Sequence, residues 1–343
     1  MNRSPHVGLG AMFAQLSLSR RAGLADAASL AVLVEDEAAE SSESAPATLA
    51  ALLALRPVLD EAMAEMPHTF SGETVALVRE AEHEGKAAFA FDLLADDYAW
   101  LERRHRASWA ALAYPALLLA MLALLLFEIS IFVLPAFSEV FQSFGGDLPG
   151  LTRAVLALAP WIGNAIAMLI LVFLLAIATS APRLQPIRRW VLRRLLRWTS
   201  TRRYLRKAAE ARLARALMHA QGGGLPALAV SRHLCATAAG ATEAVLFDEL
   251  SGHLASGVGL VEALSEIRGL PRRLPALMSL TQGRPVAVEM LRKLAELSAG
   301  EAVDQHERLR RRGVGILYAV VAIVIGICVI GLYLPIFRLG TVT

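Results

Sequence analysis

Hydrophobic residues are concentrated in three long stretches of this chain, residues 110–137, 154–182 and 313–337, which carry almost no charge. A membrane-spanning helix needs about 20 predominantly apolar residues to cross a hydrocarbon core of ~30 Å, and each stretch meets that length. The alternative, a core helix of a soluble protein, is typical of runs of about 10–14 residues. The pattern therefore predicts an integral membrane protein with transmembrane helices at residues 108–137, 154–182 and 313–338.

The polar segments around these stretches are predicted to be helical as well. Ala, Leu, Arg and Glu dominate them, and Gly and Pro fall between the periodic segments. We therefore expect an all-α membrane protein with two helical-bundle cytoplasmic domains, at residues 1–107 and 183–312. The segment Glu35 to Pro46 is acidic and rich in Ser, which predicts a loop between two helices, with an acidic partner-binding tract as the alternative.

A shift of 201 residues aligns the two polar segments with each other and predicts an internal repeat. The same shift carries the start of the first apolar stretch onto the start of the third. In each copy a glycine, Gly23 or Gly224, follows an amphipathic helix, and we expect it at the C′ position in a left-handed conformation. A phosphate-binding loop at the second glycine is a poor alternative, because no strand precedes it and no Lys-Ser/Thr follows. Matching pairs include Leu16 with Leu217, Leu59 with Leu260, Glu61 with Glu262, and Ala62 with Ala263.

Basic residues near the ends of the apolar stretches predict the direction in which the chain crosses the membrane. Arg clusters precede the first stretch, follow the second and precede the third, whereas the segment 138–153 contains only Arg153 and the chain end only Arg338. Cytoplasmic flanks are enriched in Lys and Arg. The N-terminus and the central polar domain are therefore predicted on the cytoplasmic side, with the segment 138–153 and the tail 339–343 outside.

The net charge of +3 conceals an asymmetry, because residues 1–100 carry a net charge of −10 and the remainder carries +13. Much of the positive charge lies near the membrane flanks, where anionic lipid explains it without nucleic acid. In the stretch Ile187 to Arg215, apolar and basic residues fall on neighbouring helical faces. Such a helix is predicted to lie against lipid headgroups, with an acidic partner as the alternative.

No motif for catalysis, phosphate binding, zinc binding or a cofactor occurs in the sequence. Cys235 and Cys328 are placed where a disulfide is not expected. Four acidic side chains could lend oxygen atoms to a cation, although a solvated acidic face is the preferred interpretation. These acidic residues are Glu82, Glu84, Asp92 and Asp96, and the histidines expected at ordinary helix positions are His68, His83, His219 and His233.

Glu128 is the one ionisable residue well inside a predicted span. A charged residue at the centre of a span costs at least ~2.5–3.5 kcal/mol on the insertion scale, so a partner or a raised pKa is expected. Asn164 in the second span and Cys328 or Tyr333 in the third fall at comparable depth. Our hypothesis is that Glu128 fixes helix packing or contacts another subunit or a pilin helix, with a snorkelling residue as the alternative.

Three motifs in the right order resemble the type II secretion F family, which also serves type IV pili. The first runs from Phe132 to Thr152 and includes Leu134, Pro135, Phe137, Leu148 and Pro149. The second, from Arg206 to Leu217, resembles the opening of the family's second cytoplasmic domain. The third includes Leu334, Pro335 and Phe337, and the family's Gly-Glu-x-x-Gly segment keeps Glu82 and Gly85 in the first copy but no acid in the second.

This resemblance implies a multi-pass inner-membrane assembly platform whose loop and C-terminus are periplasmic and which hydrolyses nothing itself. The implied partners are a secretion or pilus ATPase, other inner-membrane components, pilin-like subunits and membrane lipids, and we expect a homo-oligomer. No cofactor, metal or nucleic acid is expected. A small-solute transporter is the alternative, but it predicts inverted repeats and broken helices that meet at mid-membrane. The motifs do not distinguish type II secretion from a type IV pilus or a competence-like system.

Overall fold

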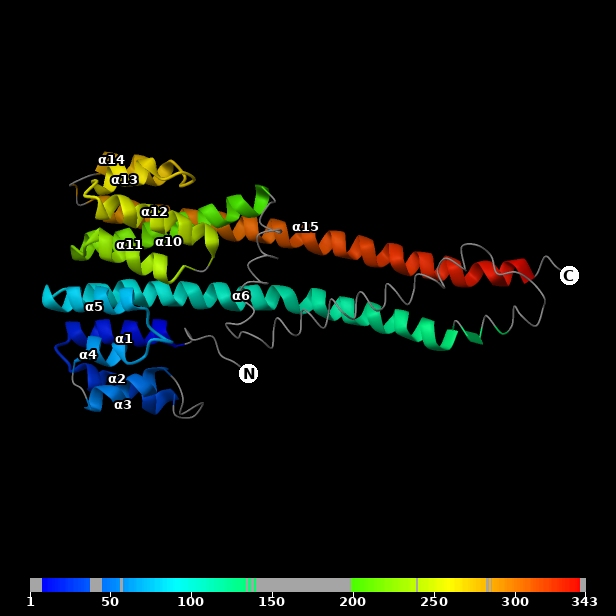
Figure 1. The fold of residues 1–343 in the computed structure, drawn as a ribbon, viewed down its shortest axis with the longest axis horizontal. Helices are drawn as coiled ribbons and strands as arrows, with labels where there is room; N and C mark the ends of the chain where they lie inside the picture. Colours follow the sequence, from blue (N-terminus) through cyan, green and yellow to red (C-terminus); the bar gives the residue numbers. More distant parts are fainter. Residues whose placement is uncertain are drawn as a thin grey trace. The chain divides into compact units, whose positions relative to one another are not determined.

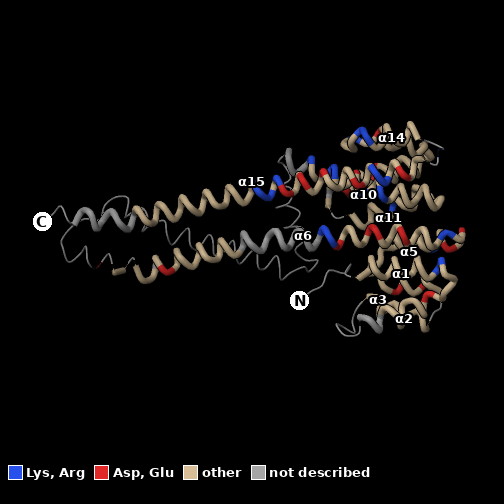
Figure 2. The backbone as a smooth tube through the Cα atoms, turned by 180° about the vertical axis from the view of Figure 1, so that it is seen from behind, with Lys and Arg blue, Asp and Glu red and all other residues tan. Residues whose placement is uncertain are grey.

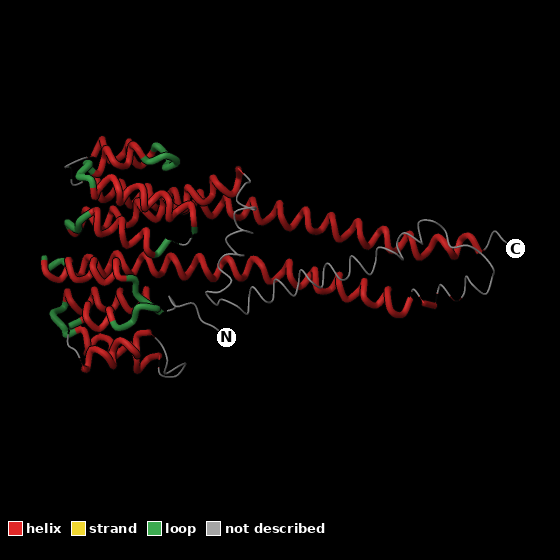
Figure 3. The backbone as a smooth tube through the Cα atoms, in the orientation of Figure 1, coloured by secondary structure: helices red, strands yellow, loops and turns green. Residues whose placement is uncertain are grey.

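The computed structural model describes residues 8–37, 45–55, 58–133, 135, 136, 139, 199–238, 240–281, 284 and 286–339. Within these residues every regular element is a helix and none is a strand (Figures 1 and 3). The all-α prediction is therefore confirmed for the described part of the chain. The predicted span at residues 154–182 lies outside it.

Both halves of the chain consist of short helices followed by one long helix. In the first half the helices are α1 (Leu9–Arg21), α2 (Asp26–Glu37), α3 (Ala45–Leu55), α4 (Leu59–Ala64), α5 (Gly72–His83) and α6 (Ala87–Glu128), and a π-helical turn, η1 (Ile129–Val133), follows α6. In the second half they are α10 (Thr199–Gly223), α11 (Ala227–Ala236), α12 (Ala241–Ala255), α13 (Leu260–Glu266), α14 (Arg273–Thr281) and α15 (Val286–Leu339).

The starts of corresponding helices are separated by similar distances along the chain. Helix α2 starts at Asp26 and α11 at Ala227, which are 201 residues apart, and α4 and α13 start at the same separation. Helices α5 and α14, beginning at Gly72 and Arg273, also differ by 201 residues. The order of helices in the first half is thus repeated in the second at the spacing that the sequence predicts.

The described residues divide into two units. The first, which we call the bundle unit, lies within Met1–Arg106 and Arg197–His306, and the second, the apolar unit, within Ala107–Leu196 and Glu307–Thr343. Charged residues occur along α15 only as far as Arg312 before Ile330, as Figure 2 shows by colour. Among the described residues α15 is the one helix long and apolar enough to cross a membrane, and the apolar stretch Leu117–Val133 at the end of α6 is shorter.

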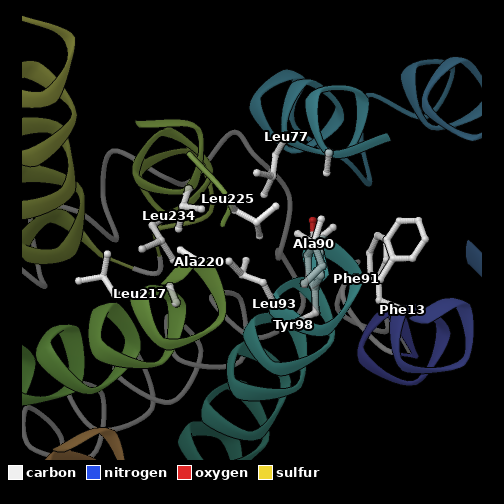
Figure 4. Close-up of a cluster of buried hydrophobic side chains, with 14 of the residues drawn as sticks. Phe13, Leu77, Ala90, Phe91, Leu93, Tyr98, Leu217, Ala220, Leu225 and Leu234 are labelled. Atoms are coloured by element: carbon white, nitrogen blue, oxygen red, sulfur yellow. The ribbon is translucent and has the colours of Figure 1, made fainter. Parts of the chain in front are cut away.

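The bundle unit has one core that both halves share. Phe13 of α1 stacks on Tyr98 of α6 with ring centroids 5.6 Å apart, and Phe70 and Phe91 lie 6.0 Å from Phe13. Figure 4 shows this aromatic group beside leucines of both halves, and all of them belong to one cluster of buried residues. Apolar burial, which contributes roughly 1.5–3 kcal/mol per large side chain, therefore holds the two halves together as well as each half internally.

Two predictions about local structure have different outcomes. The left-handed conformation predicted for Gly23 and Gly224 is confirmed, with φ of 73° and 66°. Leu24 N–H donates to Ser19 C=O, and Gly23 N–H donates to Arg20 C=O, which is the Schellman arrangement that ends a helix. The loop predicted from Glu35 to Pro46 is wrong at both ends, because α2 continues to Glu37 and α3 begins at Ala45. Helix formation by the adjoining Ala- and Leu-rich sequence outweighs the acidic and Ser-rich composition there.

We predict opposite effects on stability for two glycine-to-alanine substitutions. Gly23→Ala should destabilise the protein by about 1–2 kcal/mol, because an alanine strains a left-handed backbone even where no neighbouring atom is in the way. Gly300→Ala should stabilise it by about 0.5–1 kcal/mol, because this glycine lies inside α15 with open space around its Cα. Denaturant unfolding of the purified full-length protein, followed by circular dichroism, measures both. Equal effects of the two substitutions would contradict the prediction.

Candidate functional site

A buried ion pair joins the two halves of the chain inside the bundle unit. Arg212 on α10 donates from Nε to Asp97 Oδ1 at 2.6 Å and from Nη2 to Asp97 Oδ2 at 2.7 Å. Asp97 lies on α6, 115 residues earlier, and both side chains are almost completely inaccessible to solvent. Two parallel N–H···O bonds between planar groups fix both the distance and the orientation of the helices that carry them.

The remaining N–H groups of the Arg212 guanidinium are also satisfied. Nη1 donates to Glu243 Oε2 and to Thr237 C=O, both at 3.3 Å, and Nη2 donates to Thr237 Oγ1 at 2.6 Å. Arg104 of α6 donates to the other oxygen of the Glu243 carboxylate. All five guanidinium N–H groups therefore have acceptors, and the two arginines balance the charges of the two carboxylates.

His233 extends this network to a third helix of the first half. Its Nε2 lies 3.1 Å from Asp97 Oδ2, and its Nδ1 lies 2.9 Å from Thr74 Oγ1. A carboxylate can only accept, so Nε2 is the donor, and the neutral ring then accepts the Thr74 hydroxyl proton at Nδ1. Thr74 is held at the first turn of α5 because its backbone N–H donates to the side chain of the N-cap residue Ser71.

The charges in this network are stabilised by each other and by aromatic rings. Burial alone would raise the pKa of Asp97, but the charge and hydrogen bonds of Arg212 lower it well below its usual range. The guanidinium carbons of Arg104 and Arg212 lie 5.0 Å and 5.3 Å from the Trp100 ring centroid, within cation–π range. We call the group of Asp97, Arg212, His233 and Glu243 the interdomain lock.

The acidic side chains considered for a cation each pair with a basic group of the protein. Glu82 accepts from Arg20 at 2.6 Å, and Asp96 lies 2.7 Å from His219 Nε2. The partners of Glu84 and Asp92 are Lys86 and Arg21. In the described part of the chain no three His, Cys, Asp or Glu side chains are grouped for a metal ion.

Glu128 lies on the exposed surface of α6 in this structure, directly before η1. Its neighbours Leu122, Leu126 and Ile129 pack on the opposite side, with Cys328 of α15. Pro135 is exposed and Gly85 has a φ of 70°, so it too is left-handed. Only the helical backbone of α15 is described at Tyr333, Leu334, Pro335 and Phe337, while Leu134, Phe137, Leu148, Pro149 and Asn164 lie outside the described residues.

The interdomain lock was not predicted from the sequence. His233 was expected at an ordinary helix position, which is wrong, because it is fully buried and hydrogen-bonded through both ring nitrogens. Arg212 belongs to a motif, but nothing in that motif assigns it a partner. One signal was available: Glu210 and Arg212 interrupt a run of alanines, and a charge among small residues marks a site where helices approach closely.

Removing the guanidinium from the interdomain lock should destabilise the protein strongly. Arg212→Leu leaves Asp97 and Glu243 buried without their main partner, and we expect a loss of about 3–5 kcal/mol in the free energy of unfolding. Arg292→Ala is the matched control, since Arg292 pairs with Glu289 and Glu296 on the exposed face of α15 and should leave stability unchanged. Denaturant unfolding of both variants checks this, and equal stability of the two would contradict it.

The buried carboxylate of Glu210 should make stability depend on pH. Burial raises the pKa of Glu210, while the neighbouring Ser298 hydroxyl opposes that shift. A raised folded-state pKa favours folding below the unfolded value of about 4.3, and this contribution is lost as the pH rises through the folded value. Glu210→Gln should therefore be more stable than the parent at pH 7, and the difference should shrink towards pH 4. A difference that is independent of pH would be the contrary result.

Comparison with known proteins places this architecture. Residues 12–135 match the family described as type II secretion system (T2SS), protein F. The chain is 29% identical over 296 residues to the type 4 fimbrial assembly protein PilC of Pseudomonas putida, covering 82% of this chain and 71% of the relative. It is 23% identical over 339 residues to the type IV pilus assembly protein TapC of Aeromonas hydrophila, covering 95% and 80%. A protein transport protein HofC homolog of Escherichia coli is 30% identical over 168 residues, covering 48% and 42%. The order of motifs, the all-helical halves and these relatives agree, and the chain belongs to the family of type II secretion system protein F.

Proposed function

We propose that this protein is the inner-membrane assembly platform of a type II secretion or type IV pilus machine. It would couple a cytoplasmic ATPase to the assembly of pilin-like subunits and would hydrolyse nothing itself. Two relatives carry the name of pilus assembly proteins and one that of a protein transport protein. The single observation that carries the proposal is the interdomain lock, which joins two helical halves into one body from which α6 and α15 continue.

A platform of this kind must move as a unit if it is to pass on mechanical work. The Arg212–Asp97 pair couples α10 to α6, and His233 couples α11 to α5, so both halves are held at several points. Helix α15 continues without interruption from the bundle unit, which ends at His306, into the apolar unit, which begins at Glu307. A continuous helix resists bending, and it is therefore a suitable element for transmitting a displacement.

We further propose three membrane crossings and an internal repeat of the helical halves. The 201-residue spacing of corresponding helices supports the repeat. Large apolar side chains that are exposed along the apolar unit support lipid contact on two of the crossings. They include Leu117, Met121, Leu124 and Phe127 of α6, and Ile316, Val320, Ile323 and Ile327 of α15. The N-terminus and both halves of the bundle unit would then be cytoplasmic, and the C-terminus periplasmic.

The proposed partners follow from this arrangement. The bundle unit would bind the ATPase, and the membrane helices would contact lipids, other inner-membrane components and pilin-like subunits. Glu128, exposed among the apolar side chains of α6, would face one of these subunits or another copy of the chain. We propose a homo-oligomer, since an assembly that adds subunits around an axis requires more than one platform contact.

A break in α15 between the two units should separate ATPase binding from assembly. Asp304→Pro removes a backbone hydrogen bond and kinks the helix, at a local cost of about 3 kcal/mol, whereas Asp304→Ala keeps the helix intact. Asp304 is exposed, so neither substitution disturbs the core. We expect both variants to co-purify with the ATPase from detergent-solubilised membranes and only the alanine variant to restore pili or secretion in a strain that lacks the gene.

Three results would argue against the proposal. Pilus assembly by the proline variant at normal membrane levels would show that α15 does not transmit the movement. Failure of the parent protein to co-purify with the ATPase would remove the coupling. Hydrolysis of ATP or transport of a small solute by the purified parent protein would place it in another functional class.

A further inference from the structure

One contact between the two halves is built from elements that the chain contains twice. Helix α5 of the first half packs on α11 and on the turn that precedes it in the second half, where Thr74 is hydrogen-bonded to His233 at 2.9 Å. Figure 4 shows Leu77 of α5 pointing toward Leu225 and Leu234, and Lys86 Nζ donates to Gly224 C=O at 2.7 Å. We call this the α5–α11 contact.

The counterparts of both sides of this contact are not used within the chain in the same way. At the 201-residue spacing, α14 corresponds to α5, and the turn from α1 to α2 corresponds to the turn from α10 to α11. Helix α5 packs on α4 and α11, whereas α14 has substantial packing only on α13 among the described elements. The first half therefore has a spare copy of one surface, and the second half has a spare copy of the other.

The spare surface on α14 forms a groove. Its volume is about 1060 Å³, and helices α10, α13, α14 and α15 contribute to its lining. The residues at the positions of Thr74, Leu77 and Val78 are Pro275, Met278 and Ser279, and all three line the groove. The groove thus occupies the place on the second half where α11 packs on the first.

The spare surface on the α1–α2 turn is apolar and exposed. Leu24 and Val32 are 58% and 59% exposed, although their counterparts Leu225 and His233 are only 6% and 0% exposed in the α5–α11 contact. Exposed apolar residues that lie together outside the membrane usually mark a protein-binding surface.

The differences between the used and the spare surfaces are matched in pairs. The hydrogen-bonded pair Thr74 and His233 is replaced by Pro275 and Val32, so both partners become apolar together. Phe89 lies against Gly223, where a side chain would meet the ring. The corresponding pair is Met290 and Ala22, in which a flexible side chain faces the added methyl group.

We propose that the α1–α2 turn of one copy docks into the α14 groove of a second copy, in the manner of the α5–α11 contact. The acidic first hundred residues, with a net charge of −10, would then lie against the basic remainder of the next copy, which carries +13. Each copy offers one turn and one groove, so the contact is heterologous and produces a closed ring or a chain of copies. This inference rests on the proposed repeat and not on the proposed platform role.

Two charge substitutions test the proposal in the full-length protein. Val32→Glu places a carboxylate on the turn, and Ser279→Glu places one in the groove, at side chains exposed enough to leave the fold intact. Each variant alone should self-associate at least about tenfold more weakly, because a buried unpaired charge costs more than the 1.4 kcal/mol that corresponds to a factor of ten. Light scattering of the detergent-solubilised protein, corrected for bound detergent, gives the mass of the assembly.

A mixture of the two variants distinguishes this contact from other modes of assembly. A Val32→Glu copy keeps an intact groove and a Ser279→Glu copy keeps an intact turn, so the mixture should form dimers and nothing larger. Val245→Glu is the control, since Val245 is 64% exposed on α12 outside both surfaces, and it should assemble like the parent. The proposal is overturned by a monomeric parent, by a monomeric mixture, by full assembly of either single variant, or by equal loss in the control.

Discussion

The pairing of Arg212 with Asp97 is the interaction on which the arrangement of the bundle unit depends. Removing two charges from water costs several kcal/mol for each, and only good geometry with all donors satisfied offsets that cost. Here every guanidinium N–H has an acceptor, so a shift of α10 along α6 by one turn would leave buried charges without partners. The apolar core of leucines and phenylalanines tolerates many registers, whereas the interdomain lock permits one.

Much of the local structure could be predicted because it depends on residues close together in the sequence. The left-handed glycines at Gly23 and Gly224 follow from the need to end a helix within one turn, and the helices follow from composition and periodicity. The spacing of 201 residues, first seen as sparse identities, is the spacing at which α2 and α11 begin. The end of the acidic segment was misjudged because helix propensity of neighbouring residues extends into it.

The interdomain lock could not be predicted because its members are distant in the sequence and lie in different helices. Asp97 and His233 are 136 residues apart, and nothing near either residue indicates the other. The prediction of two helical segments also gave no indication that they share a core, since an amphipathic helix shows which face is buried but not which partner covers it. For Glu128 the sequence identified a costly position, and the structure adds only that it lies away from the Cys328 side of α6.

The two halves differ most where they meet, and this difference bears on how copies would assemble. At the 201-residue spacing the lock residues Asp97, Arg212 and His233 correspond to Ser298, Ala11 and Val32, so the lock exists once in each chain. The contact within a chain is fixed by buried, fully paired charges, while the spare surfaces keep apolar shape without those charges. A contact between copies made from them would lack the steep cost of separation that buried charge pairs impose. Such copies would be able to part and rejoin without disturbing the bundle unit, which a platform that repeatedly changes its contacts requires.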